Sequence, residues 1–84
     1  METPDILEEL LELIDQSGIE IRREAMGSGG GGMCKMKNKT VFFVDTECMP
    51  HEMASICAKT VNEILDVETV YLKPRVRQFL EGNV

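Results

Sequence analysis

The first third of the chain has hydrophobic residues at helical spacing, with acidic residues on the opposite face. Ser17-Gly18 follows, and glycine readily takes the left-handed conformation that ends a helix. The pattern therefore predicts an amphipathic helix between Thr3 and Ser17 that buries one face. The residues on that face are Ile6, Leu7, Leu10, Leu11 and Ile14, with Leu13 widening the stripe.

Three short segments then have the composition of strands. Residues 19–24 and 33–37 alternate apolar and polar positions, and residues 40–44 form the most apolar run of the chain. The glycine-rich segment 27–32 is expected to be a flexible loop, because residues with almost no side chains cannot pack. The segments on its two sides are expected to pair as a hairpin. Residues 37–40 read as a tight turn, since Asn38 tolerates a positive φ.

The second half of the chain predicts two more helices around one more strand. A helix is expected from Pro50 to about Leu65, and a short one from Pro74 to Gly82. Residues 67–72 read as a fourth strand between them. The expected buried face of the longer helix consists of Met53, Ile56, Cys57, Thr60 and Ile64, and that of the shorter helix of Val76, Phe79 and Leu80.

These elements predict one α+β domain over residues 1–84. The expected order is α-β-β-β-α-β-α, with about four strands in a single layer against two main helices and a short C-terminal helix. The chain has 84 residues, enough for one modest core. Hydrophobic residues make up 43% and charged residues 29% of the chain, a composition typical of globular proteins.

The charge balance disfavours nucleic acid and membrane partners. The net charge is −6 and the pI about 4.7, whereas nucleic-acid binders usually carry a broad basic surface. Basic residues gather only locally, at residues 35–39 and 73–77. No run approaches the ~20 apolar residues that span a bilayer. The acidic N-terminus lacks the features of a secretory signal, and three cysteines are an odd number for a disulfide framework, so a cytoplasmic protein is expected.

The glycine-rich segment does not have the context of a phosphate-binding loop. Such a loop leads directly into a helix, and in a P-loop it ends in Gly-Lys-Ser/Thr. Here it leads into Met33-Cys34-Lys35, which reads as a strand. We therefore favour a simple connection, with a binding loop that orders on meeting a partner as the alternative.

A zinc site is the most specific chemistry that the residue types suggest. Cys48 and His51 have a spacing that could place both on one metal ion, and Cys34 could approach them across the sheet. Three ligands and a water would form an open site. The simplest interpretation of Cys57 is a small apolar core residue on its helix, and that of Cys34 is the same on its strand.

The sequence contains no complete catalytic motif. Cys48 at a helix start could be a nucleophile with His51 as its base, but no orienting acid or oxyanion donor is evident. His51-Glu52 resembles the start of a zinc-peptidase HExxH motif, which needs a second histidine four residues later. That position is Ser55. We therefore do not expect an enzyme.

Residues 32–65 nevertheless resemble a known arrangement. Gly32 to Asp45, a short loop and a helix opened by Pro50 are similar to the region before the active-site helix of small bacterial zinc peptidases of the repressor-cleaving type. The HExxH motif would correspond to residues 59–63, which are Lys-Thr-Val-Asn-Glu, so no site residue carries over. The whole chain resembles a family of small uncharacterised bacterial proteins with an acidic first helix and a Gly-rich, Cys-containing hairpin.

These observations favour a non-catalytic protein-interaction or regulatory domain. Methionines flank the glycine-rich loop at Met26, Met33 and Met36, and short chains often gain stability by self-association. The expected partner is another protein or a second copy of the chain. The alternative function is a zinc-binding module that uses Cys34, Cys48 and His51.

Overall fold

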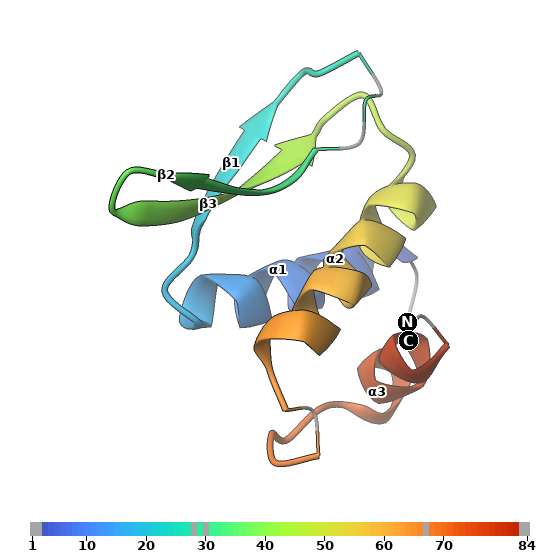
Figure 1. Ribbon diagram of the computed structural model, residues 1–84. Helices are drawn as coiled ribbons and strands as arrows, with labels where there is room; N and C mark the ends of the chain where they lie inside the picture. The colour runs from blue at the N-terminus through green and yellow to red at the C-terminus, as the bar shows by residue number, and fades with distance from the viewer. Residues whose placement is uncertain (1–2, 28, 30, 67, 83–84) are drawn as a thin grey trace.

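The structure is a computed structural model that describes residues 3–27, 29, 31–66 and 68–82, without the side chains of residues 3 and 4. In these residues the fold is α+β, with three helices and a three-stranded mixed sheet in the order α-β-β-β-α-α (Figure 1). The elements are α1 (Thr3–Gln16), β1 (Glu20–Glu24), β2 (Gly32–Met36), β3 (Lys39–Asp45), α2 (Pro50–Ile64) and α3 (Pro74–Glu81).

The predicted first helix is confirmed, including its end. The Ser17 N–H donates to the Ile14 carbonyl at 3.1 Å, and the Gly18 N–H donates to the Asp15 carbonyl at 3.0 Å. Gly18 has a φ of 86°, the left-handed conformation expected of a residue that ends a helix. All five residues of the predicted apolar face are buried.

The order of strands in the sheet is β1-β3-β2, so the predicted hairpin between β1 and β2 is wrong. β1 runs parallel to β3, with Glu20 opposite Val41, and β2 runs antiparallel to β3, with Met36 opposite Lys39. The turn between β2 and β3 is confirmed, although the positive φ of 54° belongs to Lys37. Strand pairing depends on contacts between distant residues, which the local sequence pattern does not specify. β3 is the most apolar of the three strands and lies at the centre of the sheet, where a strand is buried most completely.

The glycine-rich segment crosses the end of β3. Because β1 and β3 are parallel, the chain leaves β1 beside the end of β3 and must pass it to reach β2 on the far side. At the crossing, a Cβ built on Gly31 would lie 2.2 Å from the carbonyl oxygen of Phe43. Gly27 is held by its N–H, which donates to Glu47 Oε1 at 2.7 Å. Residues 28 and 30 lie outside the described residues, and flexibility of the loop stays a prediction.

One face of the sheet packs on α1 and α2, which lie side by side beneath it (Figure 1). Phe42 and Val44 point into this core. The predicted α2 is confirmed from Pro50 to Ile64, but its buried face is centred nearer Ala54 and Ala58 than expected. The buried residues are Met53, Ala54, Cys57, Ala58, Thr60 and Val61, and Ile56 and Ile64 are only partly buried.

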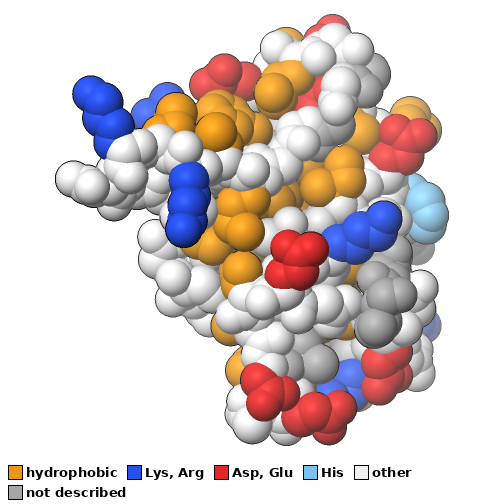
Figure 2. All heavy atoms as spheres, viewed as in Figure 1, with side chains coloured by type: hydrophobic (Ala, Val, Ile, Leu, Met, Phe, Trp, Pro, Cys, Tyr) orange, Lys and Arg blue, Asp and Glu red, His pale blue; other side chains and the backbone are white. Residues whose placement is uncertain are grey.

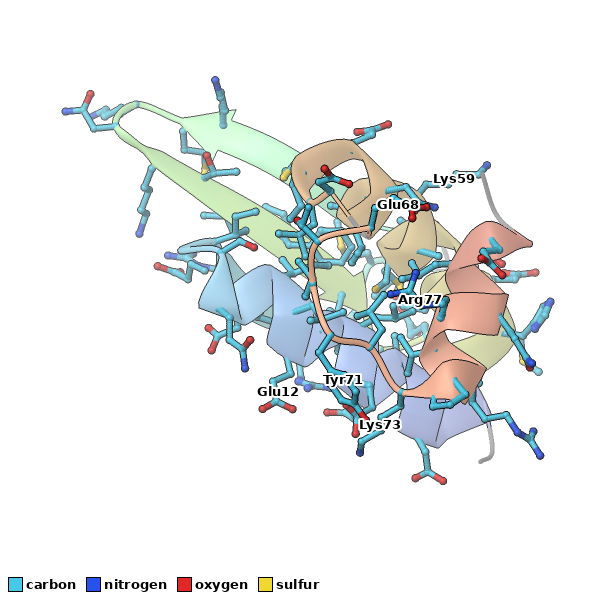
Figure 3. All side chains as sticks on the ribbon, turned by 90° about the horizontal axis from the view of Figure 1, so that it is seen from below. Glu12, Lys59, Glu68, Tyr71, Lys73 and Arg77 are labelled. Atoms are coloured by element: carbon cyan, nitrogen blue, oxygen red, sulfur yellow. The ribbon has the colours of Figure 1, made fainter. Side chains whose placement is uncertain are left out.

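The predicted strand over residues 67–72 is wrong for the described residues 68–72, which form no strand. Asp66 makes a local turn, and Nη2 of Arg77 donates to the Val70 carbonyl at 3.3 Å. Figure 3 shows Arg77 reaching from α3 toward the segment that carries Glu68 and Tyr71. Leu72 is buried in the core cluster. The segment between α2 and α3 that carries it lies on the side of the helices away from the sheet (Figure 1). Val70 and Leu72 alternate with more polar side chains as in an extended segment, but no neighbouring strand pairs with residues 68–72.

The last helix, α3, begins at Pro74 as predicted. Val76 and Leu80 are buried, and the helix packs on α1 and α2. The N–H of Gly82 donates to the Gln78 carbonyl at 3.1 Å, which closes the helix at the expected residue. None of the helices in the described residues has the length and apolar character required to span a membrane.

Candidate functional site

The three candidate zinc ligands lie on separate elements. Cys34 is exposed on β2, Cys48 is in the loop before α2, and His51 is on the first turn of α2. Among the described residues, no three His, Cys, Asp or Glu side chains are grouped so that they could hold a metal ion. The fold therefore does not bring Cys34, Cys48 and His51 together as one ligand set.

Cys48 and His51 each contact a different neighbour. The Cys48 thiol donates to Oε2 of Glu52 at 3.4 Å, and desolvation, followed by this acceptor, raises the pKa of the thiol. The His51 ring packs edge-on against Phe79 of α3, with ring centroids 6.3 Å apart. A nucleophile needs a lowered thiol pKa and a base in reach. The thiol pKa of Cys48 is shifted in the opposite direction, and the ring of His51, its predicted base, packs against Phe79.

Cys57 is confirmed as a core residue. Its side chain is fully buried in α2, and desolvation raises the pKa of its thiol to about 12. Because the thiolate is the reactive form, this cysteine is shielded both by packing and by protonation.

The three thiols should therefore react with maleimide in a fixed order. We expect Cys34 to be modified rapidly in the native protein, Cys48 more slowly, and Cys57 only after unfolding in denaturant. Intact-mass and peptide analysis over time would measure this order. Labelling of Cys57 at the rate of Cys34 under native conditions would show that the core is open.

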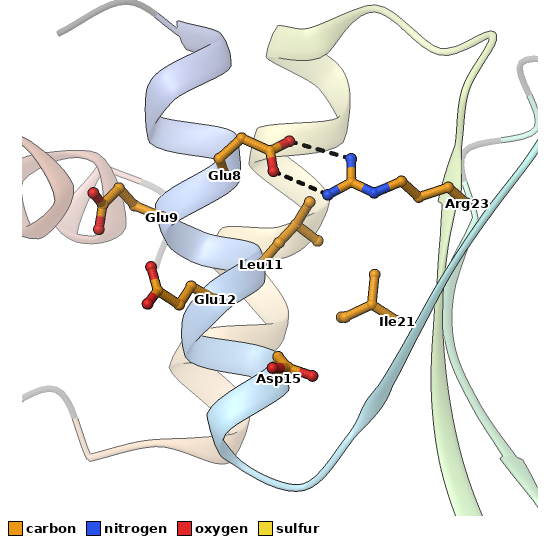
Figure 4. A pocket seen from close by; sticks show the side chains of 7 residues that line it. All are labelled: Glu8, Glu9, Leu11, Glu12, Asp15, Ile21 and Arg23. Atoms are coloured by element: carbon orange, nitrogen blue, oxygen red, sulfur yellow. Dashed lines mark hydrogen bonds and ion pairs between the residues drawn. The ribbon is translucent and has the colours of Figure 1, made fainter.

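A groove of about 610 Å³ lies between α1 and β1 (Figure 4). Leu11 and Ile21 supply its apolar part, and acidic residues of α1 line the rest. Arg23 reaches across from β1 and binds both carboxylate oxygens of Glu8, at 2.9 and 3.2 Å. On the far side of α1, Nζ of Lys73 binds Glu9 at 2.6 Å. One ion pair, between Arg23 and Glu8, therefore joins β1 to α1 across the groove, and the residues that line it include no cysteine, serine or histidine.

The sheet has an open edge at β2. Within the described chain, β3 is the only strand that pairs with β2. Met33, Cys34 and Lys35 are exposed, and the β2–β3 turn projects beyond the helices (Figure 1). The other edge strand, β1, has the sequence Glu-Ile-Arg-Arg-Glu, and such charges discourage strand addition. β2 has the sequence Gly-Met-Cys-Lys-Met, with one charge.

The register shows which backbone groups of β2 face the open edge. Residues that flank a two-residue turn exchange the hydrogen bonds that close it, so Met36 and Lys39 form such a pair. Hydrogen-bonded and non-hydrogen-bonded residue pairs alternate along an antiparallel ladder. Cys34, two residues before Met36, therefore also forms backbone hydrogen bonds to β3. Met33 and Lys35 belong to the other kind of pair, so their N–H and C=O groups point away from β3, toward the open edge. The Cys34 thiol makes a long contact of 3.9 Å with the Lys35 carbonyl oxygen.

The face of the sheet away from the helices is partly apolar. Val41 and Phe43 lie on this face, beside Cys34 in the register. Val41 is fully buried there, and Glu20, its partner on β1, pairs with Arg22 and with Lys39. Figure 2 shows hydrophobic side chains at the surface over the sheet, bordered by charged groups.

Comparison of the chain with protein-family models, with curated proteins and with solved structures found no match. The open edge of β2 is the candidate site that the geometry provides. Sequence reasoning missed it because β2 was expected to pair with β1. The available signal was the contrast between four charges in β1 and one in β2.

Proposed function

We propose that this chain is a non-catalytic protein-interaction domain that binds an extended segment of its partner along the open edge of β2. The observation that carries the proposal is the pair of residues Met33 and Lys35, whose backbone groups face outward from the sheet. Exposed edges of this kind bind peptides by adding a strand, with main-chain hydrogen bonds giving affinity.

The side chains of β2 would give such a site its specificity. Alternate residues of a strand point to opposite faces, so Cys34 lies on the open face and Met33 and Lys35 on the face toward the helices. A bound strand would thus meet a methionine and a lysine on one face and a thiol beside Val41 on the other. The raised thiol pKa values of Cys48 and Cys57 favour binding over thiol catalysis.

A pair of substitutions at Lys35 tests the proposal. Lys35→Pro removes the outward N–H without removing a bond to β3, whereas Lys35→Ala removes the charge and keeps the N–H. In affinity capture from a lysate of the source cells, the wild type and Lys35→Ala should retain the same protein, and Lys35→Pro should lose it. We expect purified partner to bind Lys35→Pro at least about tenfold more weakly, equivalent to about 1.4 kcal/mol.

Circular dichroism and thermal unfolding provide the folding control, because both variants should keep the spectrum of the wild type. If folded Lys35→Pro retains the same proteins with the same affinity as the wild type, the edge of β2 is not the binding surface.

A further inference from the structure

We propose that the segment bound at this edge is β2 of a second copy of the chain, in a two-fold dimer with Cys34 at the axis. This inference deepens the proposed function and rests on it, since the same edge is used. The two sheets would join into one continuous sheet through their β2 strands.

The hydrogen-bonding pattern of β2 permits this pairing. In an antiparallel pair centred on Cys34, Met33 lies opposite the partner's Lys35. These are the residues whose N–H and C=O groups face outward, so they form the hydrogen-bonded pairs across the axis. Cys34 bonds to its own β3, so the two Cys34 residues form a non-hydrogen-bonded pair with Cα atoms about 4.5 Å apart.

The side chains of β2 are compatible with this register. Gly32 lies opposite the partner's Met36, so a long side chain meets the residue without one. Lys35 meets a methionine instead of a like charge. Moving the axis to Lys35 would place two lysines directly opposite each other, which is unfavourable. The register centred on Cys34 therefore avoids both steric and charge conflict.

The charges of β2 also define how the dimer should respond to its surroundings. Lys35 and the partner's Lys35 share the helix-facing side of the joined sheet and lie diagonally across the axis. Their repulsion weakens the dimer and is screened by salt. Lys35→Ala should therefore tighten the dimer, and added salt should do the same in the wild type. An acidic extended segment of a different protein would show the opposite dependence.

Sedimentation equilibrium of the full chain in reducing buffer measures the dimer directly. We expect a concentration-dependent monomer–dimer equilibrium. Lys35→Pro should raise the dissociation constant at least about tenfold, and Lys35→Ala should lower it. A wild type that remains monomeric at millimolar concentration overturns the inference.

Disulfide cross-linking tests the register. All proteins carry Cys48→Ser, and diamide is the oxidant, accepting two electrons and two protons from two thiols as the disulfide forms. The protein with Cys34 should form a covalent dimer rapidly. Two further variants, Met33→Cys and Lys35→Cys, are made in a Cys34→Ser background. Each alone should cross-link slowly. An equimolar mixture should form the mixed dimer at least about tenfold faster, because residue 33 of one copy lies opposite residue 35 of the other.

The outcomes separate this inference from the proposed function. If the mixture cross-links no faster than the single variants, the two-fold register is wrong. If the chain is monomeric but Lys35→Pro still loses a different captured protein, the dimer is wrong and the edge remains a binding surface. If neither self-association nor capture depends on Lys35→Pro, both are wrong.

Discussion

Gly31→Ala is expected to destabilise the fold by about 3 kcal/mol or more. Two effects add at this residue. Its φ of +64° is strained for any residue with a side chain, at about 1–2 kcal/mol. Its new Cβ would also lie 2.2 Å from the Phe43 carbonyl oxygen and 3.0 Å from the carbonyl carbon. Both atoms are backbone of the central strand, so the chain cannot relax without disturbing the sheet.

Gly27→Ala is the matched control. Gly27 has nearly the same φ, +65°, but a Cβ there would meet nothing within 4 Å. Gly27→Ala should therefore lower the free energy of unfolding only by the strain of a positive φ in a residue with a side chain, about 1–2 kcal/mol. In thermal unfolding, Gly31→Ala should lower Tm by about 12 °C or more, since 1 kcal/mol shifts Tm by roughly 4–8 °C for a domain this small. Equal shifts for the two variants would contradict the close approach at Gly31.

Asp45→Ala should destabilise the fold by about 2–4 kcal/mol. Oδ1 of Asp45 accepts hydrogen bonds from the N–H groups of Met26, at 3.0 Å, and Glu47, at 2.9 Å. The side chain is 1% exposed, so alanine would leave two backbone donors without this acceptor in a region that water hardly reaches. The carboxylate joins the start of the glycine-rich segment to the loop that leads into α2.

Asp45→Asn tests whether the hydrogen-bond acceptor or the negative charge of Asp45 stabilises the fold, because it removes the charge and keeps one acceptor oxygen. The amide keeps one carbonyl oxygen, and a single oxygen accepts both bonds in the native structure, so the loss should be less than half that of Asp45→Ala. Urea unfolding would give both values. Hydrogen exchange at the amides of Met26 and Glu47 should accelerate in Asp45→Ala. Unchanged exchange at both amides would show that this acceptor does not hold the two loops together.

The crossing that Gly31 and Asp45 secure also creates the candidate site. If the glycine-rich segment had turned back directly, β2 would lie beside β1 and its outward groups would be paired. Passing the end of β3 leaves β2 at the edge of the sheet. Partial loss of binding is therefore expected in Gly31→Ala even under conditions where the helices remain folded.

Helices were the part of the fold that could be predicted most fully. The helical spacing of Leu10, Leu11 and Ile14 is read within one segment, and Gly18, Pro50 and Pro74 mark ends by their own backbone preferences. The prediction of the buried face of α2 was less accurate, because the short side chains of Ala54 and Ala58 contribute little to a hydrophobic pattern. Close packing with α1 decides that those positions are buried.

The predicted zinc site rested on residue types alone, and the fold does not assemble it. Cys34, Cys48 and His51 are ordinary metal ligands, but ligation needs three side chains at one point, and the fold places them on β2, a loop and α2. Cys57 was assigned correctly because its position on the helix already indicated the core. The chemistry of a single residue is local, whereas the convergence of several residues is not.

The sequence by itself determined where the helices start and stop, which short segments are extended between residues 19 and 45, and that the first helix buries one face. Only the tertiary structure decided that β3 lies between β1 and β2, that residues 68–72 have no strand beside them, and that the edge of β2 is open. Helix hydrogen bonds join residues four apart, so a segment specifies them itself. Strand partners are chosen among distant segments by the burial that the whole chain achieves.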